Sequence, residues 1–359
     1  MKQKVMLGMS GGVDSSVAAV LLLEAGYDVT GVTLKLRPDA YLSGSLSGGC
    51  DSPDDINDAK RVADVLGIPH HVLDFSGAFS EKVIDYFVRE YRAGRTPNPC
   101  IACNKNIKFK GMLRQALSMG MDYIATGHYA VIEKGEDGRS LLCRSRAAKD
   151  QSYVLYTLTQ EDLSHTLFPL GDRDKEEARA IARAHKLSVA GKPDSQEICF
   201  VDDNDYAGFI ERYTGEKALP GDFVDGVGAV IGRHKGLYHY TIGQRKGLGG
   251  GFGAPMYVTG IDPAHNRIAL GGEGSQYAGV LTAGKLNWIS IDGLSGPREV
   301  FAKVRYQAKP ARATVIPLDG GRAEVRFESP QRAVTPGQAV VFYDKRYVLG
   351  GGTIERAGS

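Results

Sequence analysis

Apolar residues show two different spacings along the first 201 residues of the chain. Short apolar runs, typical of buried strands, alternate with stretches in which apolar residues recur at helical spacing. The runs predict strands at Val5–Met9, Val29–Leu36, His71–Phe75 and Tyr123–Thr126. The other stretches predict helices at Val17–Ala25, 53–66, Phe79–Arg92, Lys105–Met119 and Arg173–His185, the last capped by Asp172. Such alternation is typical of an α/β fold, a Rossmann-like parallel sheet with helices on both faces.

The pattern changes after Val201, where glycines become frequent, helical spacing disappears and short alternating runs dominate. Runs at Ala229–Ile231, Leu237–Tyr240 and Met256–Asp262 predict a small central β domain. A second set of runs, from Leu281 onward, is separated by prolines and predicts a C-terminal β-barrel. We therefore expect three domains, covering residues 1–203, 204–276 and 277–359.

Composition excludes several classes of protein. Of the 359 residues, 42% are hydrophobic and 24% charged, which fits a folded chain rather than a disordered or fibrous one. No apolar run approaches the ~20 residues of a transmembrane helix, and the N-terminus does not resemble a signal peptide. The five cysteines are an odd number in a long chain, which disfavours a secreted disulfide framework. We expect a soluble cytoplasmic protein whose cysteines do thiol or metal chemistry.

Positive charge is concentrated locally, although the formal net charge is only +2. The stretch from Arg92 to Arg114 has six basic residues and no acidic residue, and the chain from Leu281 onward has 12 basic and 7 acidic residues. Either patch alone is as well explained by a solvated face as by an anionic partner.

A glycine- and serine-rich loop joins the first predicted strand to the first predicted helix. It reads Gly8-Met9-Ser10-Gly11-Gly12-Val13-Asp14-Ser15-Ser16. At this position its backbone N–H groups and the helix N-terminus can hold an anion. No Gly-Lys-Ser/Thr follows, so it is not a Walker A loop. It resembles the SGG-x-DS loop of ATP pyrophosphatases, which predicts adenylation with release of pyrophosphate, and Asp14 would help to hold Mg²⁺ on the phosphates.

A Cys-x-x-Cys pair and a third cysteine supply the second chemical signal. Cys100 and Cys103 follow Asn98-Pro99, just before the predicted helix at Lys105–Met119, and a helix N-terminus with lysines nearby favours a thiolate. Cys199 is flanked by strand-like residues and, taken alone, is as well explained as a buried apolar residue. Cys50 and Cys143 lack such context. Two thiols suit a persulfide relay, in which one carries sulfur and the other releases it by forming a disulfide.

These motifs resemble the bacterial tRNA-specific 2-thiouridylase family along essentially the whole chain. The matching segments are GMSGGVDSSV, TPNPCIACNKNIKF, ATGHYA, KDQSYVL, PDSQEICFV, YTIGQRKGL and VRYQ. The resemblance implies an adenine nucleotide hydrolase domain, a small central β domain and a C-terminal barrel. It also implies a tRNA-uridine 2-sulfurtransferase that adenylates wobble uridine 34 at C2 and thiolates it, in tRNAs for Lys, Glu and Gln. Sulfur would come from a cysteine desulfurase or a persulfide carrier, and the co-substrate would be ATP with Mg²⁺.

The resemblance also implies roles for individual residues. Gly8 to Ser15, Leu34 and Gly127 would bind ATP, Cys103 would be the nucleophile and Cys199 the persulfide carrier. Asn98, Pro99 and Cys100 would surround the target base. The remaining tRNA contacts would be His128, Lys149, Asp150, Gln151, Arg305, Tyr306 and Gln338.

The chain departs from some relatives at Cys100, where they carry an Asp that acts as acid or base at the uracil. Either Cys100 or water moves the proton here, or the site works differently. Cys100, Cys103 and Cys199 could instead ligate three irons of a [4Fe–4S] cluster. The loop Arg37–Cys50 is rich in Ser and Gly, which suggests a mobile segment that could dock tRNA or the sulfur donor.

Two other functions compete with tRNA thiolation. Another ATP pyrophosphatase enzyme, such as an argininosuccinate or amidotransferase-type synthetase, would need neither the cysteine pair nor a basic barrel. A non-catalytic RNA-binding protein would not need an intact SGGVDSS loop. The loop and the cysteines together favour the thiolating enzyme.

Overall fold

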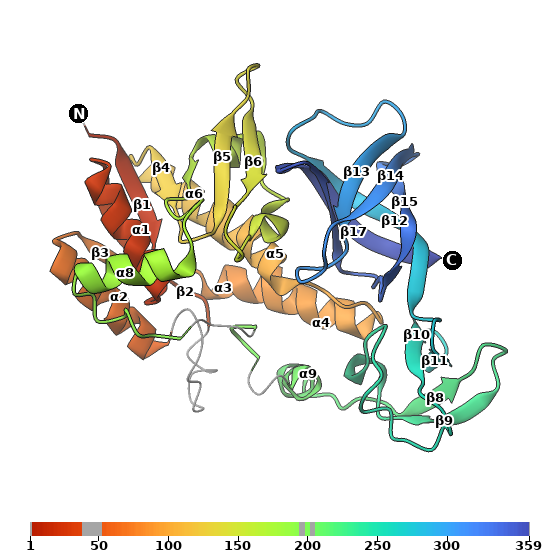
Figure 1. Cartoon of the computed structure of the whole chain (residues 1–359). Coiled ribbons are helices and arrows are strands. Elements are labelled where there is room, and N and C mark those ends of the chain that lie inside the picture. The colour runs from red at the N-terminus through yellow and green to blue at the C-terminus, as the bar shows by residue number, and fades with distance from the viewer. Residues whose placement is uncertain (1, 38–51, 194–197, 202–204, 359) are drawn as a thin grey trace.

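The protein has three parts, an N-terminal α/β part, a small central β domain and a C-terminal β-barrel (Figure 1). The computed structural model describes residues 2–37, 52–193, 198–201 and 205–358. Cys50, most of the Arg37–Cys50 loop and Asp194–Glu197 lie outside the described residues. In the described part of the chain, no helix is both long and apolar enough to span a membrane.

A five-stranded sheet forms the centre of the α/β part, as predicted. Its order is β3-β2-β1-β4-β7, and every neighbouring pair is parallel. The strands are β1 (Lys4–Gly8), β2 (Asp28–Lys35), β3 (His70–Asp74), β4 (Tyr123–Ala125) and β7 (Thr166–Leu167). Alternate residues of β1 point to opposite faces: Val5 and Leu7 enter one core, and Met6 enters the other. Both faces are therefore covered.

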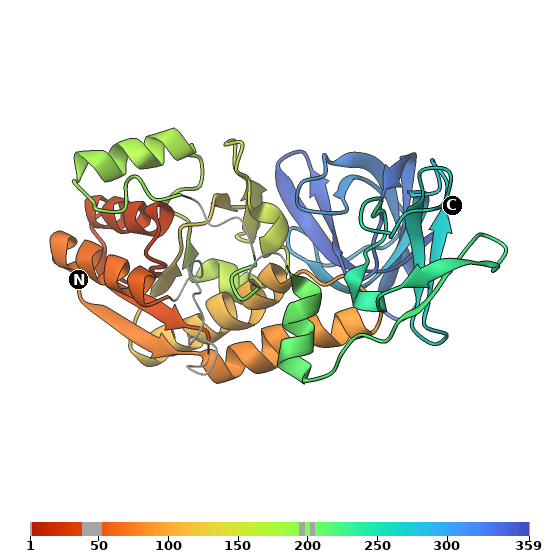
Figure 2. The same ribbon diagram turned by 90° about the horizontal axis from the view of Figure 1, so that it is seen from below.

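The first core lies between the sheet and α1 (Val13–Glu24), α2 (Pro53–Leu66) and α8 (Lys175–Ala184). On the opposite face lie α3 (Ser76–Phe79), η2 (Ser80–Ile84) and α4 (Asp85–Arg92), which form one helical run. In both ribbon views α4 reaches from the sheet toward the other two parts (Figures 1 and 2). The remaining short helices are η4 (Ser152–Leu155) and α7 (Gln160–Ser164).

The helix that carries the Cys-x-x-Cys pair begins six residues earlier than predicted. It runs without a break through α5 (Pro99–Cys103), the π-helical segment η3 (Asn104–Gly111) and α6 (Met112–Ser118). Pro99 is its first residue. Proline has no backbone N–H, but the N–H groups of the first helical turn have no partner within the helix, so a proline costs nothing at this position. The side chain of Asn98 accepts a hydrogen bond from the N–H of Ile101 at 3.2 Å. Cys100, not Cys103, therefore lies in the first turn.

The central domain contains structure that the sequence pattern did not predict. A helix, α9 (Tyr206–Thr214), precedes it, so helices do not end at Val201. The expected strand at Leu237–Tyr240 is a short 3₁₀ turn, η5 (Leu237–His239), which follows Gly236 with φ of 138°. The sheet has the order β10-β11-β8-β9. Its strands are β8 (Gly221–Val224), β9 (Val230–His234), β10 (Tyr257–Asp262) and β11 (Arg267–Gly271).

The C-terminal part is a closed barrel of six strands, which confirms the predicted fold class. Antiparallel neighbours run in the order β12-β15-β14-β13-β16-β17, and β17 pairs with β12 to close the barrel. The strands are β12 (Tyr277–Trp288), β13 (Arg298–Lys303), β14 (Ala311–Leu318), β15 (Arg322–Arg332), β16 (Ala339–Asp344) and β17 (Tyr347–Gly358). Closure pairs β12 and β17, the two strands at the ends of this order, with each other.

The α/β part and the barrel are hydrogen-bonded to each other. A hairpin of β5 (Ala130–Lys134) and β6 (Ser140–Arg144) extends the barrel sheet, with Cys143 opposite Tyr347. The Asn287 side chain donates to the carbonyl oxygens of Tyr156 at 2.7 Å and Leu158 at 3.0 Å. These bonds join the barrel to the chain around Tyr156 and Leu158.

Asp174 caps α8, not Asp172 as the sequence suggested. The Asp174 carboxylate accepts from the N–H of Glu177 at 2.8 Å, and the Glu177 carboxylate accepts from the N–H of Asp174 at 2.8 Å. This reciprocal pair satisfies two N–H groups that the helix itself cannot. Asp172 instead accepts from the N–H of Arg146.

Asp174→Ala is expected to lower the free energy of unfolding by about 1 kcal/mol, because it removes the cap of α8. Urea unfolding followed by circular dichroism measures the change. Asp174→Asn is the matched control, since asparagine caps about as well, and it should lose much less. Equal losses for the two variants would contradict the capping role.

Candidate functional site

A cavity of about 190 Å³ opens at the carboxyl end of β1, where β1 leads into α1. Its walls come from the end of β1 with the loop and first turn of α1 that follow, from β2 and the residue after it, from the cysteine-bearing helix, from the chain just after β4, and from Gln151 before η4. Its lining residues are Gly8, Met9, Ser10, Asp14, Ser15, Val32, Leu34, Leu36, Lys108, Met112, Thr126, Gly127, His128 and Gln151. Most of the residues expected to bind ATP line this cavity. Gly11, Gly12 and Val13 belong to the same loop and helix start but are not among the lining residues. Val32, Leu36, Lys108, Met112 and Thr126 also line the cavity, although the sequence motifs assigned them no role.

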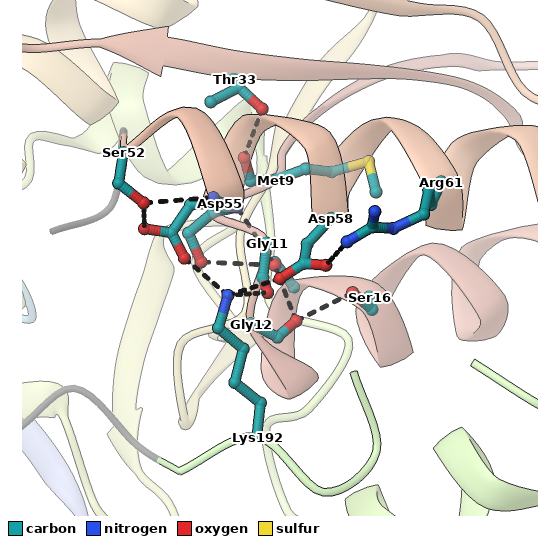
Figure 3. Close-up of polar contacts among 12 residues, drawn as sticks. Met9, Gly11, Gly12, Ser16, Thr33, Ser52, Asp55, Asp58, Arg61 and Lys192 are labelled. Atoms are coloured by element: carbon teal, nitrogen blue, oxygen red, sulfur yellow. Dashed lines mark hydrogen bonds and ion pairs between the residues drawn. The ribbon is translucent and has the colours of Figure 1, made fainter. Parts of the chain in front are cut away.

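The loop after β1 is held in place by close backbone contacts. Gly11 has φ of 68°, and a Cβ on it would lie 2.2 Å from the Asp55 carbonyl oxygen. A Cβ on Gly127 would lie 2.8 Å from the backbone nitrogen of Ser15. The Ser15 hydroxyl accepts from the N–H of Ser10 at 3.2 Å, and the Ser16 hydroxyl donates to the Gly12 carbonyl at 2.8 Å (Figure 3). Only glycine fits at these two close approaches.

The N-terminus of α1 adds a favourable place for negative charge beside the cavity. Gly12 is the cap residue of this helix, and it supplies no side-chain acceptor for the N–H groups of the first turn. Those donors and the positive end of the helix dipole favour an anion at this loop.

Two lysines approach the only carboxylate among the cavity-lining residues. Asp14 accepts from Lys149 Nζ at 3.1 Å, from Lys175 Nζ at 2.7 Å and from the Tyr129 hydroxyl at 2.7 Å. Lys149 was expected to contact tRNA. Lys175 was not expected at all, because nothing in its local sequence separates it from a surface lysine at a helix start. Together they place positive charge at the edge of the cavity, on Asp14.

His128 forms part of the cavity wall rather than an open surface. It is buried, and its Nδ1 lies 2.8 Å from the Thr126 hydroxyl. Burial lowers the pKa of His128 well below its usual value, and the positive charges of Lys108 and Lys149 add to the effect. The imidazole is therefore neutral near pH 7.

The two thiols expected to relay sulfur share one apolar core. Cys103 is buried in the core that covers one face of the sheet, and Cys199 packs against that core from a turn in which Val201 N–H donates to the Ile198 carbonyl. The expected strand around Cys199 is absent from its described neighbours, residues 198 and 200–201. Phe200 holds the turn in the core, with its ring 5.3 Å from that of Phe87.

The cysteine-bearing helix connects this core to the cavity described above. Lys108 and Met112 line the cavity, and Cys103 precedes Lys108 by five residues on the same helix. At about 1.5 Å per residue, this is a separation of roughly 7 Å along the axis.

Cys100 is exposed in the first turn of the helix, and it faces a residue of the barrel. Burial raises the pKa of the Tyr306 hydroxyl, and the nearby Asp150 and Cys100 raise it further. Lys303 Nζ lies 5.4 Å from the centre of the Tyr306 ring and 5.6 Å from that of Tyr153. Aromatic and basic residues of two domains therefore meet beside Cys100.

The chain just before Cys100 is bound to the barrel. The side chain of Gln338 donates to the carbonyl oxygens of Thr96 at 2.9 Å and Pro97 at 3.2 Å. The N–H of Thr96 donates to the Pro336 carbonyl at 2.9 Å. Gln338 and Asn98, both expected at tRNA, thus fix the start of the helix.

The other residues expected at tRNA also make contacts within the protein. Gln151 lines the cavity and accepts from the N–H of Tyr129 at 2.9 Å. Asp150 accepts from the Ser152 hydroxyl at 3.1 Å, and Arg305 donates to the Arg332 carbonyl at 3.2 Å. Their roles toward RNA stay predictions.

Possible metal ligands are dispersed in the structure. Among the described residues, which include Cys100, Cys103, Cys143 and Cys199, no three His, Cys, Asp or Glu side chains are grouped to hold a metal ion. The geometry therefore gives no support to the iron–sulfur alternative.

Comparisons with known proteins cover the whole chain. Residues 3–203 match a family model described as a tRNA methyl transferase HUP domain, residues 207–272 a tRNA methyl transferase PRC-barrel domain, and residues 279–354 an aminomethyltransferase beta-barrel domain. A tRNA-specific 2-thiouridylase MnmA from Acetivibrio thermocellus is 55% identical over 357 residues, with 99% of each chain covered. The protein of the same name from Clostridioides difficile is 53% identical over 359 residues, again covering 99% of each.

Gly11→Ala is expected to weaken binding of an ATP analogue at least about tenfold, or about 1.4 kcal/mol. The added methyl group would collide with the Asp55 carbonyl and displace the loop. Titration calorimetry measures the affinity. Gly26→Ala is the control, because Gly26 also has positive φ but its Cβ would meet nothing within 4 Å. Unchanged affinity in Gly11→Ala would contradict this account of the loop.

Replacing His128 with Gln should flatten the pH dependence of stability. The folded protein holds His128 neutral, whereas the unfolded chain takes up a proton below about pH 6.5, so acid favours unfolding. Wild-type stability should fall as the pH drops from 6.5 to 5, by up to about 1.4 kcal/mol per pH unit from this group. Urea unfolding at each pH gives the slopes, and parallel slopes for the two proteins would rule out the buried neutral imidazole.

Proposed function

The chain belongs to the tRNA-specific 2-thiouridylase family, and from that premise we propose that it makes 2-thiouridine at the wobble position of tRNA. In the proposed reaction, ATP adenylates uridine 34 at C2, and sulfur from a cysteine persulfide then displaces AMP. The substrates are expected to be the tRNAs for Lys, Glu and Gln. A cysteine desulfurase or a persulfide carrier would supply the sulfur.

One observation carries the proposal: a single helix bears the two thiols of the Cys-x-x-Cys pair and lines the cavity beside the glycine-rich loop. Cys103 and Lys108 belong to this helix, and Lys108 faces the cavity. An activated uridine and a sulfur nucleophile must come within bonding distance of each other. Because the helix is shared, the thiol of Cys103 lies on the same element as a residue that lines the proposed ATP cavity.

The cavity fits the phosphates of ATP. Its glycines allow close approach of the backbone, the first turn of α1 offers N–H donors, and Lys149 and Lys175 supply positive charge. The role of these residues is to bind and orient the phosphates so that the α-phosphate is open to attack by the uridine oxygen. Asp14 would exchange its lysine contacts for a shared role in holding Mg²⁺, which takes one or two carboxylates together with phosphate oxygens.

Sulfur transfer can be written with all atoms accounted for. The terminal sulfur of a Cys199 persulfide attacks C2, and the former C2 oxygen leaves as part of AMP. The thiolate of Cys103 then attacks the Sγ of Cys199, which breaks the S–S bond, leaves the sulfur on C2 and forms a Cys103–Cys199 disulfide. An external dithiol reduces this disulfide and a persulfide donor reloads Cys199. The protein as described carries both residues as thiols.

Cys100 is proposed to move the proton at the uracil. Its place in the first turn favours a negative charge, because the positive end of the helix dipole lies there. The hydroxyl of Tyr306 is close enough to sense that charge. RNA would reach this point across the barrel, where Arg305 and Tyr306 are expected to contact it. Extruding a base costs a few kcal/mol, which such contacts offset.

Thiolation is favoured over methyl transfer, although two of the matched domain models carry a methyl transferase name. The loop resembles one that grips the pyrophosphate of ATP, and methyl transfer gives no role to a thiol pair placed beside it. The iron–sulfur route to the same product remains a separate hypothesis, and the experiment below distinguishes it from the persulfide route.

Cys103→Ser and Cys199→Ser are each expected to abolish 2-thiouridine formation while leaving ATP affinity unchanged, because each removes a sulfur atom and leaves the nucleotide cavity intact. Thiolation of purified tRNA is measured by mass spectrometry of digested nucleosides, and ATP binding by calorimetry. Cys143→Ser is the matched control: Cys143 is buried at the junction with the barrel, and this variant should keep activity.

The same assay, run with metal analysis, separates the two sulfur routes. Iron-free protein that turns over with a persulfide donor would support the relay. Activity that requires iron bound to anaerobically purified protein would contradict it, as would full thiolation by either serine variant.

A further inference from the structure

Lys303, the last residue of β13, is a buried lysine to which the proposed function gives no role. Only 9% of the residue is exposed. Its Nζ lies 5.4 Å from the centre of the Tyr306 ring and 5.6 Å from that of Tyr153. The faces of the two rings attract the cation, but they offer no oxygen to its three N–H donors. With the residues that the structure describes, the ammonium forms no hydrogen bond and no ion pair.

The carboxylate that attracts Lys303 already has its acceptor positions occupied. One oxygen of Asp150 accepts from the N–H groups of Ser145 at 3.2 Å and Ser152 at 3.1 Å. The other oxygen accepts from the Ser152 hydroxyl at 3.1 Å and from Arg144 Nε at 3.3 Å. An ionised carboxylate offers about four such positions. Asp150 is therefore satisfied without the ammonium of Lys303.

The surrounding protein does not compensate for the burial of Lys303. Burial lowers the pKa of its ammonium, Asp150 offsets part of this effect, and the positive charge of Arg144 adds to it, so that the net shift is downward. A buried charge costs free energy unless a partner of opposite charge binds it. The ammonium is thus suited to an acceptor from outside the chain.

The ammonium lies next to the place where the target base is expected. Of the two rings beside Lys303, that of Tyr153 is fully buried and that of Tyr306 is 37% exposed. The charges of Cys100 and Lys149 both act on the hydroxyl of Tyr306. The exposed ring is therefore the side from which an RNA bound at Cys100 can reach the ammonium.

We propose that Lys303 binds a phosphodiester oxygen of the RNA beside the uridine that is thiolated. This inference rests on the proposed function, because it takes tRNA as the substrate. A phosphate supplies both the negative charge and the acceptor oxygens that the buried ammonium lacks. The phosphates of ATP are expected at the glycine-rich loop, with Lys149 and Lys175, so the anion at Lys303 is a different one. Its contact would hold the RNA backbone in register while the base is extruded.

The test measures binding of an unmodified tRNA for Glu to the full-length protein, by fluorescence anisotropy, from about 50 to about 200 mM KCl. Lys303→Met removes the charge, and Lys303→Arg keeps it. Lys345→Met is the matched control, because Lys345 is an exposed lysine in the turn between β16 and β17, and its replacement removes the same charge from the barrel. Urea unfolding of each variant measures its stability.

Lys303→Met should weaken tRNA binding about tenfold at low salt, the effect of losing one charged hydrogen bond. The slope of log affinity against log salt should become shallower by about 0.7, the value for one phosphate of a single strand. Lys303→Arg should recover most of the affinity, and Lys345→Met should bind as the wild type does. Lys303→Met should be no less stable than the wild type, because it removes a buried charge that has no partner of opposite sign.

A second measurement identifies the phosphate. Two tRNAs are assembled, each with an uncharged methylphosphonate at one of the two phosphates that flank uridine 34, and each is titrated with the wild type and with Lys303→Met. At the phosphate that Lys303 contacts, the modification should weaken binding to the wild type about tenfold and should have little further effect on Lys303→Met.

An unchanged salt slope in Lys303→Met would overturn the contact while leaving the proposed function intact, as would equal losses for the two proteins at both phosphates. A variant that loses stability and keeps the wild-type slope would assign Lys303 a structural role and overturn the contact as well. Failure of the wild type to bind tRNA even at low salt would instead overturn the proposed function, and the contact with it.

Discussion

The hydrogen bonds from the Gln338 side chain to Thr96 and Pro97 fix the start of the cysteine-bearing helix against the barrel. Everything proposed for the site depends on where that helix begins and how it is aimed. One end meets the barrel near Tyr306, and the middle lines the cavity beside the glycine-rich loop through Lys108 and Met112. The amide of Gln338 is partly buried, so losing both acceptors would carry a desolvation cost, and the junction resists small rearrangements.

Charged side chains contact the glycine-rich loop of the α/β part on two sides. On the cavity side, Lys149 and Lys175 lie on Asp14, and α1 presents its N-terminus. On the far side, Lys192 ties Gly11 to the acidic start of α2. These contacts hold the loop from both sides.

The fold was largely readable from the sequence because its signals are local. Ser52 followed by Pro53 and two aspartates marked the start of α2, and Gly67 marked its end with φ of 67°. Local signals also misled. The helix predicted at Lys105–Met119 begins earlier, because a proline fits well at the first position of a helix and Asn98 caps the turn that Pro99 starts. Asp172 and Asp174 are both suitable caps, but Asp174 is followed three residues later by Glu177, a local capping-box signature that the prediction overlooked and the structure shows to be formed.

The sequence by itself determined which chemical groups the protein has: a glycine-rich loop that only small residues can form, and three cysteines in two motifs. It also determined the order of the folded parts, an α/β part followed by a barrel. Spacing along the chain carries this information, because a strand–loop–helix junction and a Cys-x-x-Cys turn are built from neighbouring residues. Tertiary structure alone decided which distant groups meet. Lys175 reaches Asp14, Gln338 reaches Thr96, and Lys192 reaches Gly11 across more than a hundred residues of chain. No local pattern distinguishes those side chains from ordinary surface residues, since their partners are set by how the sheet, the helices and the barrel pack together.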